Sequence, residues 1–318
     1  MWMLLAWLAG AAPAPLSQLS RVSVGGREHV RLQDWARLQG FRGHWLNSRD
    51  FRLTNSSARL EFTVNSQRMI VNGISVFLTA PVLLQSAAPL IALADLQTTV
   101  HPLLWPTRRQ GVKTPLICID AGHGGRDTGN LEGKRLEKDL TLSLARELAA
   151  QLRKAGYKAF LTRSWDTSLE LDTRPEIARK RGAHLFVSLH FNAAGNREAS
   201  GAEVYCLTPP YAASTNARGE GAGTGPLPGN RQNDANLLLA YHLQRSMVSR
   251  LKMEDRGVRR ARWAVLRQAT MPAVLVEAGF MSNPDDSKKL YSSAWRKQLA
   301  GSLVEGIKSY QRLIAPAT

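Results

Sequence analysis

The chain of 318 residues contains little cysteine, and this scarcity excludes one way of binding metal. Its two cysteines, Cys118 and Cys206, do not belong to a C-x-x-C pair, so a cysteine-based metal site is not expected. Both lie within predicted strands, where two buried free thiols are more plausible than a disulfide. The fold must therefore depend on a hydrophobic core, for which a hydrophobic content of 44% is adequate.

Acidic residues are also scarce, because 25 Asp and Glu stand against 42 Lys and Arg and give a net charge of +17. The excess is not confined to one end, since residues 1–113 carry 12 basic and 5 acidic residues. Such a charge indicates either an acidic partner or an ordinary basic, solvated surface. No helix-turn-helix, zinc-finger or RNA-binding motif accompanies the charge, so a nucleic-acid partner is not expected.

Charge is absent from the start of the chain, where residues 2–12 (WMLLAWLAGAA) are apolar and Arg21 is the first charged residue. This run is shorter than the ~20 residues that a membrane-spanning helix needs. It resembles the core of a signal peptide, with Ala9-Gly10-Ala11 as the cleavage site, although the usual preceding basic residues are missing. We read residues 1–19 as signal peptide and start of the mature chain. An exported protein is expected, without a transmembrane anchor after cleavage.

Residues 20–105 are predicted to form a small α+β accessory domain. It contains two hairpin signals, each a glycine-containing turn between short β-type runs, and each is followed by a predicted short helix. The turns are Gly25-Gly26 and Asn72-Gly73, and the helices are residues 33–38 and 89–100. The pattern resembles the small stalk-like module that is found at the N-terminus of copper amine oxidases and attached to many bacterial cell-surface proteins. Without a catalytic constellation, the domain is expected to bind the cell wall, to position the rest of the chain, or to act as a spacer.

Residues 106–114 are predicted to be a linker, and strands alternate with helices in the catalytic domain that follows, residues 115–318. This alternation predicts an α/β fold with a mostly parallel sheet flanked by helices. The predicted strands are residues 116–120, 157–162, 184–189, 202–207, 263–266 and 273–277. The predicted helices are residues 137–154, 173–181, 234–252 and 287–312. Residues 208–231 are predicted to be a long loop, because Gly and Pro are too frequent there for a long helix.

Four polar residues stand at the ends of predicted elements in this region. His123 lies in the glycine-rich loop after the first strand, and Glu137 begins the first helix. His190 ends the third strand, and Glu277 ends the last. In open α/β sheets, ligands bind at the carboxyl ends of the strands. Two histidines and a glutamate are a frequent ligand set of catalytic zinc, and a further carboxylate suits general acid–base catalysis.

Other carboxylates near these positions leave alternatives open. Glu132 could replace Glu137 as a ligand if the loop were threaded differently. Asp120 and Asp127 flank His123, and both are interpreted as structural residues or as hydrogen-bond partners of a ligating histidine. The sequence pattern alone does not decide between these arrangements.

Five segments together resemble the zinc-dependent N-acetylmuramoyl-L-alanine amidases of type 3. They are IDAGHGGRDTGN, LEKDLTLSLA, VSLHFNA, DRGVRRARWAVLR and PAVLVEAGFMSNPDD, in the order of that family. The resemblance covers about residues 115–313. It implies a Zn2+ cofactor held by His123, Glu137 and His190, with Glu277 as the catalytic carboxylate.

The resemblance also implies a reaction and a partner. The reaction is hydrolysis of the amide bond between N-acetylmuramic acid and L-alanine in peptidoglycan, which serves cell-wall remodelling or cell separation. The resemblance places the exported protein in the periplasm or at the cell wall, where the basic surface could in addition meet acidic cell-envelope polymers. The alternative is a catalytically weak protein of the same fold that binds or regulates the wall.

Several residues around the implied site have two interpretations. Arg259 and Arg260 could meet carboxylates of the substrate peptide, could pair with Glu277, or could simply be exposed. Asn192 could line the site. His184 is expected to be structural.

Overall fold

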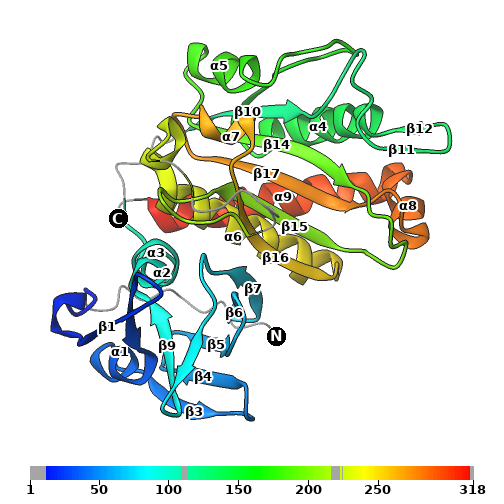
Figure 1. The fold of residues 1–318 in the computed structure, drawn as a ribbon. Helices are drawn as coiled ribbons and strands as arrows, with labels where there is room; N and C mark the ends of the chain where they lie inside the picture. The colour runs from blue at the N-terminus through cyan, green and yellow to red at the C-terminus, as the bar shows by residue number, and fades with distance from the viewer. Residues whose placement is uncertain (1–11, 109–113, 216–222, 224, 316–318) are drawn as a thin grey trace. The chain divides into compact units, whose positions relative to one another are not determined.

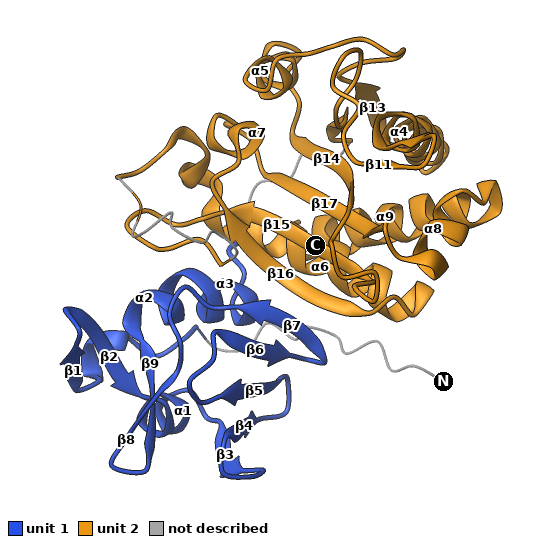
Figure 2. Ribbon diagram, turned by 45° about the vertical axis from the view of Figure 1, so that its right-hand side comes forward, with its two compact units in different colours: residues 1–108 blue, residues 109–318 orange. Residues whose placement is uncertain are grey.

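The computed structural model describes residues 12–108, 114–215, 223 and 225–315, and it divides into two compact units, residues 1–108 and 109–318 (Figures 1 and 2). Residues 2–11 of the predicted signal-peptide core and residues 109–113 of the predicted linker lie outside the described residues. Among the described residues, no helix is both long and apolar enough to cross a membrane.

The first unit is built from two sheets of short antiparallel strands, in the orders β1-β2-β9-β8 and β7-β6-β5-β4-β3. Its strands are β1 (Arg21–Val24), β2 (Arg27–Arg31), β3 (Arg42–Trp45), β4 (Asp50–Thr54), β5 (Arg59–Thr63), β6 (Arg68–Val71), β7 (Ile74–Phe77), β8 (Leu83–Gln85) and β9 (Ala88–Ala92). Its α-helices are α1 (Leu32–Leu38), α2 (Leu93–Asp95) and α3 (His101–Leu104). Both predicted hairpins are confirmed, because Gly25-Gly26 joins β1 to β2 and Asn72-Gly73 joins β6 to β7.

The prediction of a helix over residues 89–100 is wrong in its first part. Residues 88–92 form β9, which pairs with β2 and buries Leu90 and Ile91. Helical structure begins only at Leu93, and the buried Asp95 accepts hydrogen bonds from the backbone of residues 79 and 80. Long-range strand pairing outweighs the local helical pattern here.

The second unit is a six-stranded sheet in the order β13-β10-β14-β17-β15-β16, covered by helices (Figure 1). Its strands are β10 (Leu116–Ala121), β13 (Lys158–Leu161), β14 (Leu185–Asn192), β15 (Ala202–Leu207), β16 (Asp255–Ala261) and β17 (Ala273–Phe280), with a separate hairpin of β11 (Leu131–Glu132) and β12 (Arg135–Leu136). Its α-helices are α4 (Glu137–Lys154), α5 (Thr173–Lys180), α6 (Asn233–Leu251), α7 (Ala264–Arg267), α8 (Pro284–Leu290) and α9 (Ser293–Ile314). All neighbouring strands are parallel except β15 and β17, so the predicted mostly parallel sheet is confirmed.

The apolar residues explain how the layers pack. Helix α4 buries a stripe of leucines at four-residue spacing, and α4 and α6 both pack against α9 along the sheet. A separate cluster joins the strands to Ala178 of α5 and Val265 of α7. The cluster includes Cys118, and Cys118 and Cys206 are both buried free thiols, as predicted.

Two predictions for this unit are wrong. Residues 263–266 are not a strand, because Trp263 packs its ring on Tyr205 and α7 follows it. The strand is instead β16, residues Asp255–Ala261, which precedes Trp263 in the chain and pairs with β15. The predicted helix over residues 287–312 is two helices, α8 and α9, since Ser292 caps the start of the second one.

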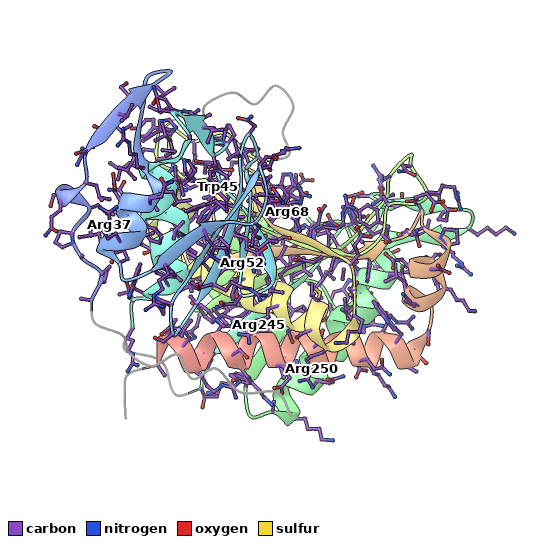
Figure 3. All side chains as sticks on the ribbon, turned by 90° about the horizontal axis from the view of Figure 1, so that it is seen from below. Arg37, Trp45, Arg52, Arg68, Arg245 and Arg250 are labelled. Atoms are coloured by element: carbon purple, nitrogen blue, oxygen red, sulfur yellow. The ribbon has the colours of Figure 1, made fainter. Side chains whose placement is uncertain are left out.

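Basic side chains occur in both units. Figure 3 labels Arg37, Arg52 and Arg68 in the first unit, and Arg245 and Arg250 on α6 in the second. The structure thus agrees with the sequence in placing the positive charge on the folded units rather than in one terminal tail.

Candidate metal centre and active site

Three adjacent parallel strands bring the candidate residues to one end of the sheet. Strand β10 leads into the loop that carries His123, and its neighbour β14 carries His190 near its carboxyl end. On the other side of β14, strand β17 places Glu277 in register with His190. Glu137 is the first residue of α4, which follows the loop. The site therefore lies where ligands bind in open α/β sheets.

His123, Glu137 and His190 converge on one point, and their ligand atoms all lie within 4.8 Å of one another. Glu137 Oε1 is 3.1 Å from His123 Nε2 and 3.1 Å from His190 Nδ1, and the two ring nitrogens are also 3.1 Å apart. In a tetrahedral zinc site with ligand distances of ~2.0–2.1 Å, ligand atoms are ~3.3 Å apart. The observed separations fit a small divalent cation of this kind.

The Glu137 carboxylate is buried but held in its ionised form. Its Oε2 accepts hydrogen bonds of 2.9 Å from the backbone and side-chain nitrogens of Asn130, and its Oε1 accepts one from the backbone of Phe191. Burial alone would raise the pKa of Glu137, but the hydrogen bonds and charges of His123 and His190 outweigh it and hold the pKa well below its usual range. An ionised carboxylate is the form that binds a cation.

The orientation of His123 is fixed on two sides. Its Nδ1 lies 2.9 Å from Asp127 Oδ2, which leaves Nε2 to point into the cluster. The backbone of His123 is left-handed, with φ of 61°, and its carbonyl oxygen accepts a 2.8 Å hydrogen bond from Arg174. Gly122 and Gly129 cannot carry side chains, because their Cβ positions are taken by the His190 ring and by His123 and Glu137.

The buried ion pair of Asp120 and Arg174 supports the loop that carries His123. Asp120 is fully buried and accepts hydrogen bonds from Thr162 and Ser188 at 2.7 Å and from Arg174 at 2.9 Å. Burial would raise the pKa of Asp120, but Arg174 and the two hydroxyl groups outweigh it and lower the pKa. Because Arg174 also bonds the His123 carbonyl, the ion pair connects the sheet to the loop.

Asp120→Ala is expected to destabilise the metal-free protein by about 3–5 kcal/mol, because it leaves the buried Arg174 charge without its partner. The measurement is the free energy of unfolding in urea. Glu176→Ala on α5 is the control, since the ion pairs that Glu176 forms with Arg179 and Lys180 are exposed and their loss should leave stability close to that of the parent. Equal effects of the two substitutions would contradict the supporting role of Asp120.

Glu277 lies next to the cluster and forms no ion pair with another described residue. Its Oε2 atom is buried and has no hydrogen-bond partner among the residues that the structure describes. Burial and the nearby charges of Glu137 and Glu203 raise the pKa of Glu277 well above its usual range. Neither Arg259 nor Arg260 forms the alternative ion pair with Glu277. Arg259 instead pairs with Glu203 at 2.8 Å, and Arg260 Nη1 donates to the backbone oxygen of Leu207 at 3.4 Å.

The remaining candidates lie outside the cluster. Glu132 forms an ion pair with Arg197 at 2.9 Å and is not one of the converging residues. His184 is structural, since its Nδ1 accepts a hydrogen bond from the backbone of Leu116. Asn192 donates to Glu203 at 2.8 Å. Glu203 lies opposite Glu277 in the antiparallel register of β15 and β17.

Sequence analysis did not identify three supporting residues: Asn130, Arg174 and Glu203. Asn130 lies within the quoted glycine-loop motif, so its position there could have indicated a role. Arg174 and Glu203 reach the site only through the packing of α5 and the pairing of β15, which no local pattern encodes.

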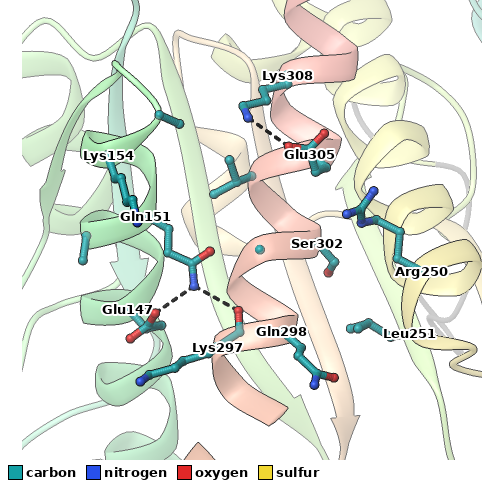
Figure 4. Close-up of a pocket in the computed structure, with 14 residues that line it drawn as sticks. Glu147, Gln151, Lys154, Arg250, Leu251, Lys297, Gln298, Ser302, Glu305 and Lys308 are labelled. Carbon is teal, nitrogen blue, oxygen red and sulfur yellow. Dashed lines mark hydrogen bonds and ion pairs between the residues drawn. The ribbon is translucent and has the colours of Figure 1, made fainter. Parts of the chain in front are cut away.

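A large hollow of about 1020 Å3 lies elsewhere, between helices α4, α6 and α9 (Figure 4). Polar side chains line it, among them Gln151, which donates to Glu147 and to the backbone of Lys297. None of the candidate catalytic residues lines this hollow. Size alone therefore does not identify the active site of this protein.

Comparison with known proteins identifies the family of this chain. Residues 117–309, more than half of the chain, match the family described as N-acetylmuramoyl-L-alanine amidase. The chain is 31% identical to the amidase AmiA of Escherichia coli K12, over 78% of this chain and 92% of AmiA. It is 36% identical to the amidase AmiC of Neisseria meningitidis serogroup B, over 68% of this chain but only 57% of AmiC.

Solved structures give the same result. The amidase AmiC2 of Nostoc punctiforme matches with a TM-score of 0.52 at 33% identity, covering 64% of this chain and 99% of that one. The catalytic domain of the amidase CwlV from Bacillus (Paenibacillus) polymyxa matches with a TM-score of 0.52 at 29% identity, covering 63% and 99%. The chain belongs to the N-acetylmuramoyl-L-alanine amidase family and hydrolyses the amide bond between N-acetylmuramic acid and L-alanine in peptidoglycan.

Proposed function

We propose that the chain carries out this hydrolysis with a zinc ion held by His123, Glu137 and His190. The observation that supports the proposal is the convergence of three ligand atoms within 4.8 Å. Imidazole nitrogen and carboxylate oxygen are preferred zinc ligands, and three protein ligands leave a position for water or substrate. When bound, zinc would polarise the amide carbonyl and lower the pKa of water.

The surrounding residues would keep the ligands ready to bind. Asp127 accepts the Nδ1 proton of His123 and so keeps Nε2 unprotonated toward the cluster. Asn130 holds the second oxygen of Glu137 and leaves the first one facing the two histidines. These hydrogen bonds fix both side chains in the orientation in which they would hold the ion.

Glu277 would move the proton in the reaction. An amide is a poor substrate for hydrolysis, since water must lose a proton and the leaving nitrogen must gain one. Glu277 has a carboxyl group with no ion-pair partner among the described residues and a raised pKa, which suits a group that accepts a proton and then delivers it. We propose that it takes the proton of the attacking water and passes it to the alanine nitrogen.

The test is the release of free stem peptides from purified sacculi by the purified chain alone. We expect release without an activator protein, because the described part of residues 208–231 contains no α-helix that could block the site, only the short 3-10 helix Pro228–Gln232. A chelator should stop the release and added zinc should restore it. Binding to sacculi without release would favour the alternative, a wall-binding or regulatory protein.

We further propose where the chain acts. Its substrate is part of the cell wall, so we propose export, to the periplasm or the wall itself. Residues 115–318, which contain every candidate site residue, would be the catalytic domain, and residues 20–105 an accessory domain joined by residues 106–114. The net charge of +17 would favour contact with acidic envelope polymers beside peptidoglycan.

A further inference from the structure

A hollow of about 600 Å3 is lined by segments of the chain that also supply residues of the candidate active site. The β11–β12 hairpin lines it with Glu132 and Arg135 and then leads directly into Glu137. Met281, just after β17, also lines it and donates its backbone N–H to the Asn192 carbonyl at the end of β14. The segments that supply the site therefore continue into this hollow, which we call the Arg135 pocket.

The Arg135 pocket has an excess of positive charge. Its ionisable lining residues are Arg135, Arg197, Lys288 and Glu132, apart from the tyrosine Tyr291. Glu132 pairs with Arg197 at 2.9 Å, so these two charges offset each other. Arg135 and Lys288 then remain, and within the described part of the chain neither forms an ion pair with a carboxylate.

The contacts that hold Arg135 within the described ranges are with neutral groups. Its guanidinium carbon lies 4.0 Å from the centre of the Tyr291 ring, and its Nη1 donates to Ser287 Oγ at 3.1 Å. Stacking on an aromatic ring fixes the plane of a guanidinium and leaves its other N–H groups directed outward. A guanidinium fixed in this way can bind a carboxylate through two parallel hydrogen bonds.

We propose that the Arg135 pocket binds a carboxylate of the stem peptide, on the alanine side of the bond that is cut. This inference rests on the proposed function. The sugar side of the substrate carries no charge near this bond, whereas the peptide side carries carboxylates from the residue after alanine onward. Arg135 lies two residues before the ligand Glu137, so the pocket and the ligand belong to one short segment of the chain. An extended peptide of two residues spans ~7 Å beyond the bond that is cut.

The test compares two small probes, N-acetyl-L-alanyl-D-glutamate and its diamide, which lacks both carboxylates. Their dissociation constants are measured by calorimetry on the zinc-loaded full chain. We expect the parent to bind the acid more tightly than the diamide. Arg135→Gln should weaken binding of the acid about tenfold, the scale of one charge-assisted hydrogen bond, and change binding of the diamide less than twofold.

Lys134→Gln is the matched control, because Lys134 is an exposed cation on the same hairpin turn that does not line the pocket. Lys288→Gln is a second test variant on α8, which should also weaken only the acid and leaves the hairpin intact. Equal binding of both probes by the parent, or equal weakening of both by Arg135→Gln, would overturn the proposal. Failure of the amidase function would appear instead as no release from sacculi, and it would not alter this comparison of affinities.

Discussion

Replacing His190 by alanine should remove zinc from the protein and abolish the release of stem peptides. Three ligand atoms meet at the site, and His190 Nδ1 lies 3.1 Å from both His123 Nε2 and Glu137 Oε1. Without this ring only two protein ligands remain, and catalytic zinc sites use three. Metal analysis after dialysis should find one zinc per chain in the parent and far less in the variant.

His184→Ala is the matched control, because this histidine lies just before the same strand, β14. Its ring accepts a hydrogen bond from the backbone N–H of Leu116 and takes no part in the cluster. It should keep its zinc and most of its activity. A full complement of zinc in His190→Ala would show that the ion is held elsewhere, and the assignment of the three ligands would then be wrong.

The placement of the site could be predicted from sequence because its residues lie at the ends of strongly patterned elements. Strand β10 is an apolar run that ends in a glycine-rich loop, and α4 has leucines at four-residue spacing, so both elements are confirmed nearly to the residue. Residues at the carboxyl ends of neighbouring parallel strands must lie close together. The meeting of His123 with His190 follows from this rule.

Elements whose burial depends on distant partners could not be predicted. Strand β16 has the sequence DRGVRRA, which is too charged to read as a buried strand, yet Arg260 within it is fully buried beside β15. The Asp120–Arg174 pair is similar, because its two residues are far apart in sequence and meet only when α5 packs on the sheet. Such residues are recognisable only once the strand order is known.

Glu277→Gln should keep the fold and the zinc but lower amidase activity by ~10²–10⁴-fold or more, the usual contribution of a general acid–base group. The substitution keeps the volume of the side chain and removes its proton-accepting oxygen. It breaks no ion pair among the described residues, since Arg259 pairs with Glu203 instead. Release of stem peptides from sacculi, zinc content and melting temperature are the three measurements.

The pH dependence of stability provides a separate check of the environment of Glu277. Its pKa is raised in the folded protein from the ordinary value of 4.5, chiefly by burial, so the folded state favours the protonated form. Stability contributed by this proton is fully present below pH 4.5 and is lost as the pH rises through the raised pKa. Glutamine does not titrate, so the metal-free variant should gain stability relative to the parent over that interval.

These measurements separate a catalytic role of Glu277 from a structural one. A structural residue would lower activity only in proportion to the loss of stability, whereas a proton carrier would lower activity in a stable, zinc-loaded protein. Activity within a few-fold of the parent at normal zinc content would remove Glu277 from the mechanism. The base would then have to be sought among Asp120, Asp127 and Glu132. Because Asp120 is buried against Arg174 and Glu132 pairs with Arg197, Asp127 would be tested first.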